Sequence, residues 1–311
     1  MKAAQINEYG DASVVHINEV DVPTISAGQV LVEVHAASLN PFDTSVRAGY
    51  MKEMIPLQFP VTLGGDIAGV VTEVSEGVTN VAVGDKVYGQ ANAVAGNSGA
   101  IAEYAATKAG EVAKIPEGTD FKEAASLALA GVSAVQAINH HIKLQAGQKL
   151  FINGGAGAIG ANTIQIAKGL GAYIAVTATG ESIEFVKQLG ADEVIDYKTT
   201  DFTEVLSNFD AVFDTVGGEG FTKSLAILKQ GGIAVSMAAQ ADEARVKELD
   251  VTAISQSTHV TTKALDELSE LIKTGTLRAL IDTVFPLDQI KEAFEAREAG
   301  NVQTKIVIEI K

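Results

Sequence analysis

Hydrophobic and polar residues follow two different patterns along the chain. From residue 1 to about residue 117, short runs rich in Val and Ile are separated by turns that carry Asp, Gly or Pro. Such runs predict strands, at 1–6, 14–17, 30–35, 67–74, 86–89 and 102–105. Their spacing favours a compact antiparallel barrel or sandwich over a series of strand–helix–strand units.

The pattern changes near Pro116. Asp120 is a candidate N-cap for a helix over 121–130, and a second helical stretch covers 132–141. Strands then alternate with helices, and the strands are predicted at 149–153, 173–177, 193–196, 209–214, 232–236 and 251–258. This alternation predicts an α/β fold with a doubly wound, parallel, six-stranded Rossmann sheet.

The C-terminal part returns to the first pattern. A leucine-striped helix ending at Gly275, a strand ending at Phe285 and a helix over 287–299 lead to a last strand over 305–310. Alternating Ile and Val in this last strand predict that it pairs with the N-terminal β-rich domain. The predicted domains are therefore a β-rich domain, 1–117 with 259–311, and a Rossmann domain, 118–258.

A glycine-rich turn, Gly154-Gly155-Ala156-Gly157-Ala158-Ile159-Gly160, directly follows the strand over 149–153. Three of its glycines fill the pattern G-x-G-x-x-G, and strand, turn, helix and second strand form the βαβ unit that a dinucleotide site requires. Exposed N–H groups and the helix dipole at such a turn suit a pyrophosphate. The alternative is a purely structural turn. We expect cofactor contacts from Gly155, Gly157, Ala158, Ile159 and Gly160.

The end of the second strand bears on the choice of dinucleotide. NAD sites usually place Asp or Glu there, to accept from the ribose 2′-hydroxyl. Here Thr177-Ala178-Thr179-Gly180 carries no charge, and Thr179 and Ser182 offer hydroxyl donors to a 2′-phosphate. We therefore expect NADP(H). Glu181, if turned inward, would reverse this preference.

Composition excludes several classes of function. The 311 residues have a formal net charge of −16, which argues against nucleic acid and against an anionic membrane surface. No cysteine is present, which excludes disulfides, thiolate metal sites and a cysteine nucleophile. No hydrophobic run approaches the roughly 20 residues of a membrane span, and the N-terminus lacks the apolar core of a signal peptide. We expect a cytoplasmic protein.

Several motifs together resemble one family, the zinc-free quinone oxidoreductase branch of the medium-chain dehydrogenase/reductase superfamily, over essentially the whole length. The motifs are Asn40-Pro41-Phe42-Asp43 with Arg47-Ala48-Gly49-Tyr50, the run from Gly64 to Val71, Ala102-Glu103-Tyr104, the run from Asp214 to Gly218, and Thr304-Lys305-Ile306-Val307. Gly65 and Asp66 replace the His and Glu of the Gly-His-Glu motif of zinc alcohol dehydrogenases. Since a catalytic zinc needs about three protein ligands, we expect no metal.

The resemblance implies a GroES-like β-rich domain, a cofactor held between the two domains and a homodimer. It also implies two catalytic candidates. Asn40 would lie near the nicotinamide and donate to a substrate oxygen that gains negative charge; the alternative is a turn residue before Pro41. Tyr50 would stack on a flat substrate or donate its phenol proton; the alternative is a partly buried loop tyrosine.

Further cofactor-binding candidates come either from this resemblance or from their position and hydroxyl groups at the carboxyl ends of the sheet. They are Ser133, Thr177, Thr179, Ser182, Tyr197, Val216, Gly217 and Lys305. Ser133 alternatively bonds its own helix backbone, and Lys305 alternatively only flanks the last strand. For Asp43 and Arg47 we expect a local ion pair that shapes their loop.

These expectations combine into a function. The chain would be an NADPH-dependent, metal-free reductase that transfers hydride to a quinone or to an α,β-unsaturated carbonyl, both small-molecule substrates. Two alternatives stay open. One is an enoyl-thioester reductase with Tyr50 as proton donor, and the other is an NADPH-binding sensor without turnover.

Overall fold

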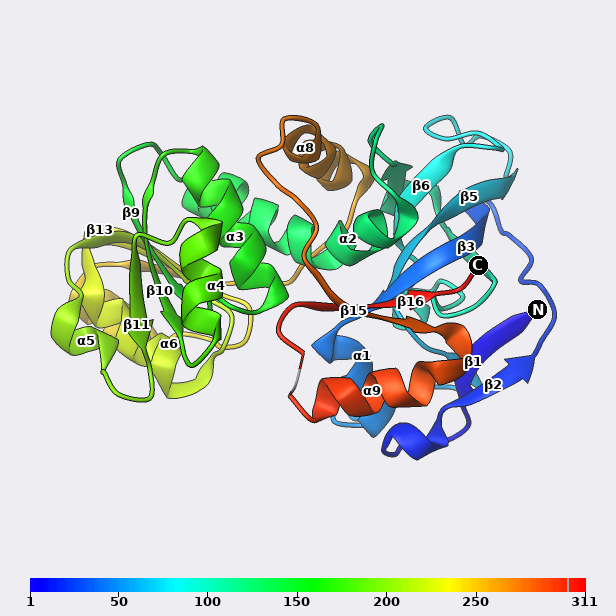
Figure 1. The fold of residues 1–311 in the computed structure, drawn as a ribbon, viewed down its shortest axis with the longest axis horizontal. Coiled ribbons are helices and arrows are strands. Elements are labelled where there is room, and N and C mark those ends of the chain that lie inside the picture. Colours follow the sequence, from blue (N-terminus) through cyan, green and yellow to red (C-terminus); the bar gives the residue numbers. More distant parts are fainter. Residues whose placement is uncertain (301) are drawn as a thin grey trace. The chain divides into compact units, whose positions relative to one another are not determined.

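The computed structural model describes residues 1–300 and 302–311, and the chain divides into two compact units. The β-rich unit comprises Met1–Leu129, Val260–Lys273 and Ala279–Lys311, and the Rossmann unit comprises Ala130–His259 and Thr274–Arg278. The division follows Leu129, inside a helix, whereas the sequence pattern places it after residue 117. Figure 1 labels the elements of both units.

The β-rich unit contains two sheets. In the larger sheet the order is β15-β16-β3-β5-β6-β8, with β7 also paired to β3, and in the smaller it is β2-β1-β4. The strands are β1 (Lys2–Ile6), β2 (His16–Glu19), β3 (Gln29–Leu39), β4 (Val61–Thr62), β5 (Asp66–Val74), β6 (Lys86–Gln90), β7 (Tyr104–Lys108), β8 (Val112–Lys114), β15 (Ile281–Pro286) and β16 (Lys305–Glu309). The antiparallel pairing of β16 with β3 confirms the expected return of the last strand.

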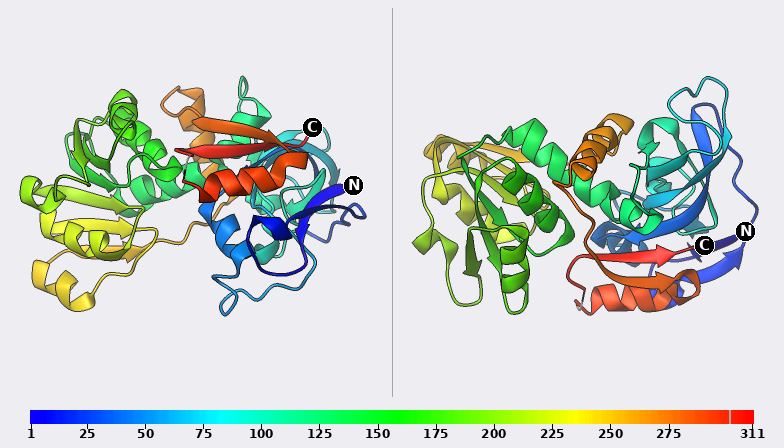
Figure 2. Two further views of the ribbon diagram at one scale, coloured as in Figure 1. Left: turned by 60° about the horizontal axis from the view of Figure 1, so that its bottom comes forward. Right: turned by 45° about the horizontal axis from the view of Figure 1, so that its top comes forward.

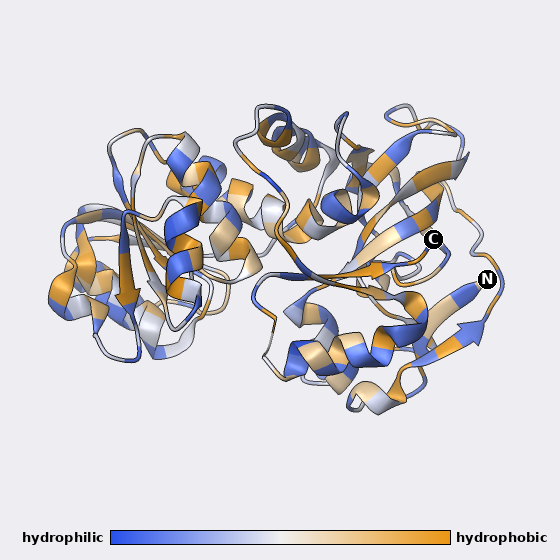
Figure 3. Cartoon of the chain, in the orientation of Figure 1, coloured by the Kyte–Doolittle hydropathy of each residue, from blue (hydrophilic) through white to orange (hydrophobic). Residues whose placement is uncertain are grey.

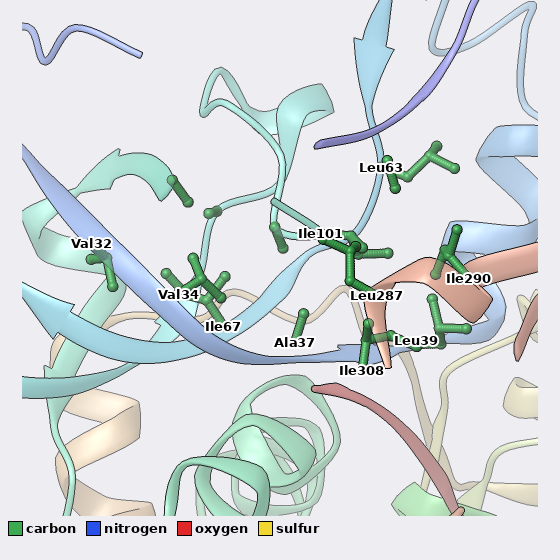
Figure 4. Close-up of a cluster of buried hydrophobic side chains, with 14 of the residues drawn as sticks. Val32, Val34, Ala37, Leu39, Leu63, Ile67, Ile101, Leu287, Ile290 and Ile308 are labelled. Carbon is green, nitrogen blue, oxygen red and sulfur yellow. The ribbon is translucent and has the colours of Figure 1, made fainter. Parts of the chain in front are cut away.

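A hydrophobic core joins the strands of this unit. Figure 4 shows side chains from β3, β5 and β16 packed with residues of the segment after β15. The labelled residues are Val32, Val34, Ala37, Leu39, Leu63, Ile67, Ile101, Leu287, Ile290 and Ile308. Helix α9 (Ile290–Glu298) buries Ile290, Ala293 and Phe294, the spacing of one helical face. Figure 2 shows β15 and β16 side by side next to this helix, and Figure 3 shows hydrophobic and hydrophilic residues alternating along it.

The Rossmann unit is built on the predicted six-stranded parallel sheet, in the order β11-β10-β9-β12-β13-β14. The strands are β9 (Lys149–Asn153), β10 (Tyr173–Ala178), β11 (Glu193–Asp196), β12 (Phe209–Asp214), β13 (Leu228–Ser236) and β14 (Thr252–Ser255). The helices are α3 (Ala158–Gly169), α4 (Ser182–Leu189), α5 (Phe202–Val205), α6 (Gly218–Ser224) and α7 (Glu243–Leu249). The strand order reverses between β9 and β12. Ligands of doubly wound sheets bind beyond the carboxyl ends of the strands at such a point.

Several elements differ from the sequence prediction. Helix α1 (Pro41–Ala48) forms where only a loop was expected. The helical stretch before β9 is one continuous helix, α2 (Phe121–Val135), that continues into a π-helical turn over Gln136–Ile142. Strand β13 (Leu228–Ser236) begins four residues before the strand predicted at 232–236.

Helix α1 forms because its termini carry strong local signals. Asn40 is the N-cap, Pro41 occupies the first helical position, and the Asp43 carboxylate accepts from the Asn40 backbone N–H at 2.7 Å. Gly49, with φ of 77°, ends the helix in the left-handed conformation that glycine tolerates best. Helix α8 (Thr262–Lys273) packs against β8. Within the described ranges, no helix combines the length and the hydropathy that crossing a bilayer requires.

Candidate functional site

The glycine turn between β9 and α3 is closely packed at two of its glycines. A Cβ atom on Gly155 would lie 2.8 Å from Val176 Cβ, and one on Gly160 would lie 2.2 Å from the Gly154 carbonyl oxygen. Backbone N–H groups tie the turn to the neighbouring strand: Gly154 donates to Thr177 Oγ1 at 2.8 Å, and Gly155 donates to the Thr177 carbonyl at 3.1 Å. These contacts hold the start of α3 against the sheet.

Gly157 differs from the other two glycines of the motif. A Cβ atom there would meet nothing within 4 Å, so internal packing does not require glycine. Gly157 is also the N-cap of α3, and no side chain caps this helix start. The first N–H groups of a helix lack partners within the helix, and an anion satisfies them well. The open space, the uncapped N–H groups of residues 158–160 and the helix dipole therefore fit the pyrophosphate of a nicotinamide dinucleotide.

A buried polar network supports this turn from behind. Thr177 Oγ1 donates to Asn153 Oδ1 at 2.8 Å, and Asn153 Nδ2 donates to Asp214 Oδ1 at 2.8 Å. Asp214 Oδ2 also accepts from Ser236 Oγ at 2.6 Å and from the Gly217 N–H at 2.9 Å. The network joins the carboxyl ends of four neighbouring strands, β10, β9, β12 and β13. The Thr177 hydroxyl therefore binds other protein groups, and it links the glycine turn to Asn153.

The remaining candidates of the Rossmann unit occupy different environments. Val216 follows β12 and is 62% exposed, and Gly217, with φ of 82°, comes directly after it. Tyr197 follows β11 and is 58% exposed. The Ser182 N–H donates to the Thr179 carbonyl at 3.2 Å where α4 begins. Ser133 is fully buried in α2. Its hydroxyl forms a hydrogen bond of 2.7 Å with the Thr258 hydroxyl, which lies outside this helix.

In the β-rich unit the candidates converge on one buried carboxylate, Asp66. Its Oδ2 accepts from Ser38 Oγ at 3.0 Å, from Asn40 Nδ2 at 2.9 Å and from Lys305 Nζ at 3.2 Å. Its Oδ1 accepts from Gln90 Nε2 at 3.4 Å and from the Leu129 N–H at 3.2 Å. Five donors therefore surround a side chain with no exposed surface. We call Asn40, Asp66 and Lys305 the Asn40 cluster.

Asn40 and Lys305 are joined directly within this cluster. Lys305 Nζ donates to Asn40 Oδ1 at 2.8 Å, and the two residues are 5% and 3% exposed. Burial lowers the pKa of Lys305, against the opposing effect of the neighbouring Asp66 carboxylate. The structure therefore brings together two residues that the sequence singled out separately, one as catalytic and one as cofactor-binding. The sequence did not predict that Asp66 would bind both of these residues, because Asp66 was noted only as part of a motif.

The expected ion pair between Asp43 and Arg47 is wrong. Arg47, fully buried, instead bonds the carboxylate of Glu298, and its guanidinium lies 4.9 Å from the centre of the Phe294 ring. Burial raises the pKa of Asp43 to about 7, although its bond from the Asn40 N–H opposes this shift. Arg47 therefore pairs with a carboxylate of α9 rather than with Asp43.

Tyr50 lies in the segment that follows α1, and its side chain is 82% exposed. Its backbone N–H donates to the Ser45 carbonyl at 3.1 Å. The alternative of a partly buried loop tyrosine is wrong, because solvent surrounds most of the ring. Whether the phenol meets a substrate stays a prediction.

The residues around Asp66 do not fit a zinc ion. The chain has no cysteine, and Gly65 offers no ligand atom. A lysine ammonium and an asparagine amide occupy the Asp66 oxygen that a metal would need. Among the described residues, no three His, Asp or Glu side chains are grouped to hold a metal.

Comparisons with known proteins agree with this arrangement. Residues 26–117 match the family model for the alcohol dehydrogenase GroES-like domain, and residues 189–308 match a model described as zinc-binding dehydrogenase. A chloroplast envelope quinone oxidoreductase homolog of Arabidopsis thaliana is 31% identical, over 99% of this chain and 98% of its own length. An NADPH-dependent alkenal/one oxidoreductase of the same plant is 32% identical, over 99% of this chain and 79% of its own length.

A solved structure extends the likeness to the fold. The quinone oxidoreductase of Coxiella burnetii has a TM-score of 0.91 and 32% identity, and the match covers 100% of this chain and 99% of that one. The likeness therefore includes both the GroES-like and the Rossmann parts. This chain belongs to the zinc-free quinone oxidoreductase branch of the medium-chain dehydrogenase/reductase superfamily, a family of oxidoreductases.

Proposed function

We propose that the chain is an NADPH-dependent reductase that transfers hydride to quinones or to the β-carbon of α,β-unsaturated carbonyls. The observation that carries the proposal is the glycine turn, where packing requires Gly155 and Gly160 but leaves open space at Gly157. Relatives that are named for quinone and for alkenal/one reduction support the choice of acceptor. When bound, a reduced nicotinamide supplies the hydride, and the protein supplies orientation and electrostatics.

In this proposal the Rossmann unit holds the coenzyme. The N–H groups of Ala158, Ile159 and Gly160 bind the pyrophosphate, and Thr179 and Ser182 face the adenosine ribose. Tyr197 flanks the adenosine. Val216 and Gly217, with Ser133, contact the nicotinamide part.

The Asn40 amide is the proposed contact to the substrate oxygen. An amide nitrogen carries two N–H groups, and Asp66 accepts one of them at 2.9 Å. The Asn40 side chain also bonds Asp43, and its amide is proposed to stabilise the negative charge that a quinone or enone oxygen gains as the hydride arrives. Lys305 holds the amide in this orientation, and no direct cofactor contact is assigned to it. The product takes its proton from water.

An enoyl-thioester reductase is the second candidate, because the 82% exposed Tyr50 phenol is free to reach a large substrate. In that case Tyr50→Phe would abolish the reduction of acyl thioesters. An NADPH-binding sensor without turnover is the third. The homodimer and the cytoplasmic location also stay predictions.

An acceptor screen with purified protein tests the proposal. NADPH and NADH are each combined with quinones, enones and enoyl thioesters, with and without a chelator. We expect oxidation of the coenzyme by quinones or enones that the chelator does not change. Binding without oxidation by any acceptor would support the sensor instead, and oxidation only on addition of zinc would refute the proposal.

A further inference from the structure

The ends of strands β10 and β11 place a carboxylate next to the residues proposed to face the adenosine ribose. The strands are parallel, with Ala178 opposite Asp196, so Thr179 follows directly beside Asp196. The Thr179 hydroxyl bonds the Asp196 carboxylate. Asp196 Oδ1 also accepts from the Lys198 N–H at 3.0 Å, which holds the carboxylate at the strand end.

This strand end belongs to the same edge of the sheet as the glycine turn. Gly154 and Gly155 both donate hydrogen bonds to Thr177, two residues before Thr179. In doubly wound folds the pyrophosphate binds at the first helix start, and the ribose lies by the end of the next strand. Here that strand end is Thr179, and the nearest carboxylate is supplied by the neighbouring strand.

The charges at this position oppose a phosphate. The lysine whose charge acts on Asp196 is Lys198, and among the described residues no ion pair involves Asp196. Glu181, at the start of α4, is exposed and adds a second negative charge nearby in the sequence. Asp196 therefore places a negatively charged carboxylate beside Thr179, with Lys198 as a cation that acts on it. A carboxylate accepts well from a hydroxyl and repels a phosphate dianion.

We propose that Asp196 is the residue that sets the coenzyme preference of this chain. Its carboxylate accepts from the ribose 2′-hydroxyl of NADH and opposes the 2′-phosphate of NADPH, so the preference for NADPH over NADH stays small. The proposal deepens the proposed function and rests on it, because it requires that a nicotinamide dinucleotide binds at the glycine turn. Asp196 ends the third strand of the sheet, one strand away from the position where NAD sites usually place their carboxylate.

Coenzyme binding by Asp196→Asn tests the inference without reference to turnover. Dissociation constants for NADPH and NADH are measured by titration calorimetry for the unmodified chain, for Asp196→Asn and for Asp201→Asn. Asp201 is a matched control, since its carboxylate also accepts from a backbone N–H and a threonine hydroxyl, both of Thr203, in the same unit. Asp196→Ser provides a second variant that removes the charge.

We expect Asp196→Asn and Asp196→Ser to shift the ratio of the two dissociation constants about tenfold toward NADPH, and Asp201→Asn to leave it within about twofold. If the unmodified chain binds both coenzymes and the Asp196 variants leave the ratio unchanged, the inference is wrong while the proposed function stands. If the unmodified chain binds neither coenzyme, the proposed function itself fails. The two failures are therefore distinguishable.

Discussion

Lys305 Nζ donates to Asn40 Oδ1 at 2.8 Å, across 265 residues of sequence. Because a lysine ammonium only donates, the Asn40 atom that faces it is the amide oxygen. The amide nitrogen must then face Asp66, whose carboxylate only accepts when ionised. The two charged neighbours thus fix the orientation of the amide.

Replacing Asn40 tests the role given to its amide. We expect Asn40→Ala to lower kcat about 10²- to 10³-fold with a quinone or enone acceptor, the usual effect of removing one donor to a developing oxyanion. Coenzyme affinity should stay unchanged, because the glycine turn is untouched. Steady-state kinetics and calorimetry measure the two effects, with Ser45→Ala on the same helix as control. An equal loss of kcat with the control would contradict the assignment.

Lys305 and Asp66 form a buried ion pair that a double-mutant cycle can separate. Lys305→Met leaves the Asp66 carboxylate buried without its cation, and we expect a loss of about 3–5 kcal/mol in the free energy of unfolding. Adding Asp66→Asn removes the buried charge and should restore part of this loss. Denaturant unfolding of both single variants and the double variant measures the coupling. Strict additivity of the two losses would show that the pair does not act as a unit.

The raised pKa of Asp43 predicts that the free energy of unfolding depends on pH. Its pKa is about 7 in the folded chain, above the ordinary value of 3.8, mainly because of burial. As the pH rises, the Asp43 carboxyl ionises near pH 4 in the unfolded chain but only near pH 7 in the folded chain. The free energy of unfolding therefore falls between about pH 4 and pH 7. Asp43→Asn cannot ionise, and its carbonyl still accepts from the Asn40 N–H.

We therefore expect Asp43→Asn to gain more than about 1 kcal/mol relative to the unmodified chain between pH 5 and pH 8. Denaturant unfolding at the two pH values measures this difference, with Asp288→Asn, at an exposed position, as control. A variant whose stability follows the same pH curve as the unmodified chain would contradict the assignment.

The glycine turn offers a contrast between folding and binding. Gly160→Ala places a methyl group 2.2 Å from the Gly154 carbonyl, so we expect a clear loss of thermal stability. Gly157→Ala meets no protein atom within 4 Å, so the variant should fold normally but bind the coenzyme at least tenfold more weakly, because the methyl occupies the approach of the pyrophosphate. Thermal unfolding and calorimetry separate the two effects. Normal coenzyme binding by Gly157→Ala would place the pyrophosphate elsewhere.

Much of the Rossmann unit could be predicted because its signals are local. The strands β9, β11 and β12 have the predicted bounds, since each is a short apolar run that ends at a turn. Helix α1 was missed although Asn40 and Pro41 are strong helix-start signals, because this stretch was interpreted as a motif in a loop. The extra length of β13 depends on pairing with β12, and a single sequence does not reveal such pairing.

The candidate site could be predicted only in part for a related reason. The roles of the glycines follow from the pattern around them, whereas Asp66 gains its importance from donors on four separate stretches of the chain. Arg47 pairs with Glu298 rather than with the nearby Asp43 because α9 packs against α1, a contact between distant parts of the sequence. Residues that act through long-range contacts therefore required the structure.

The most direct test of the central claim follows a labelled hydride. The purified chain is given an α,β-unsaturated ketone and a reduced coenzyme that carries deuterium on the transferred position of nicotinamide C4, and the product is analysed by mass spectrometry and NMR. The account predicts one deuterium at the β-carbon of the saturated product, in the presence of a chelator as in its absence. A product without deuterium, or deuterium transfer only in the presence of added zinc, would contradict it.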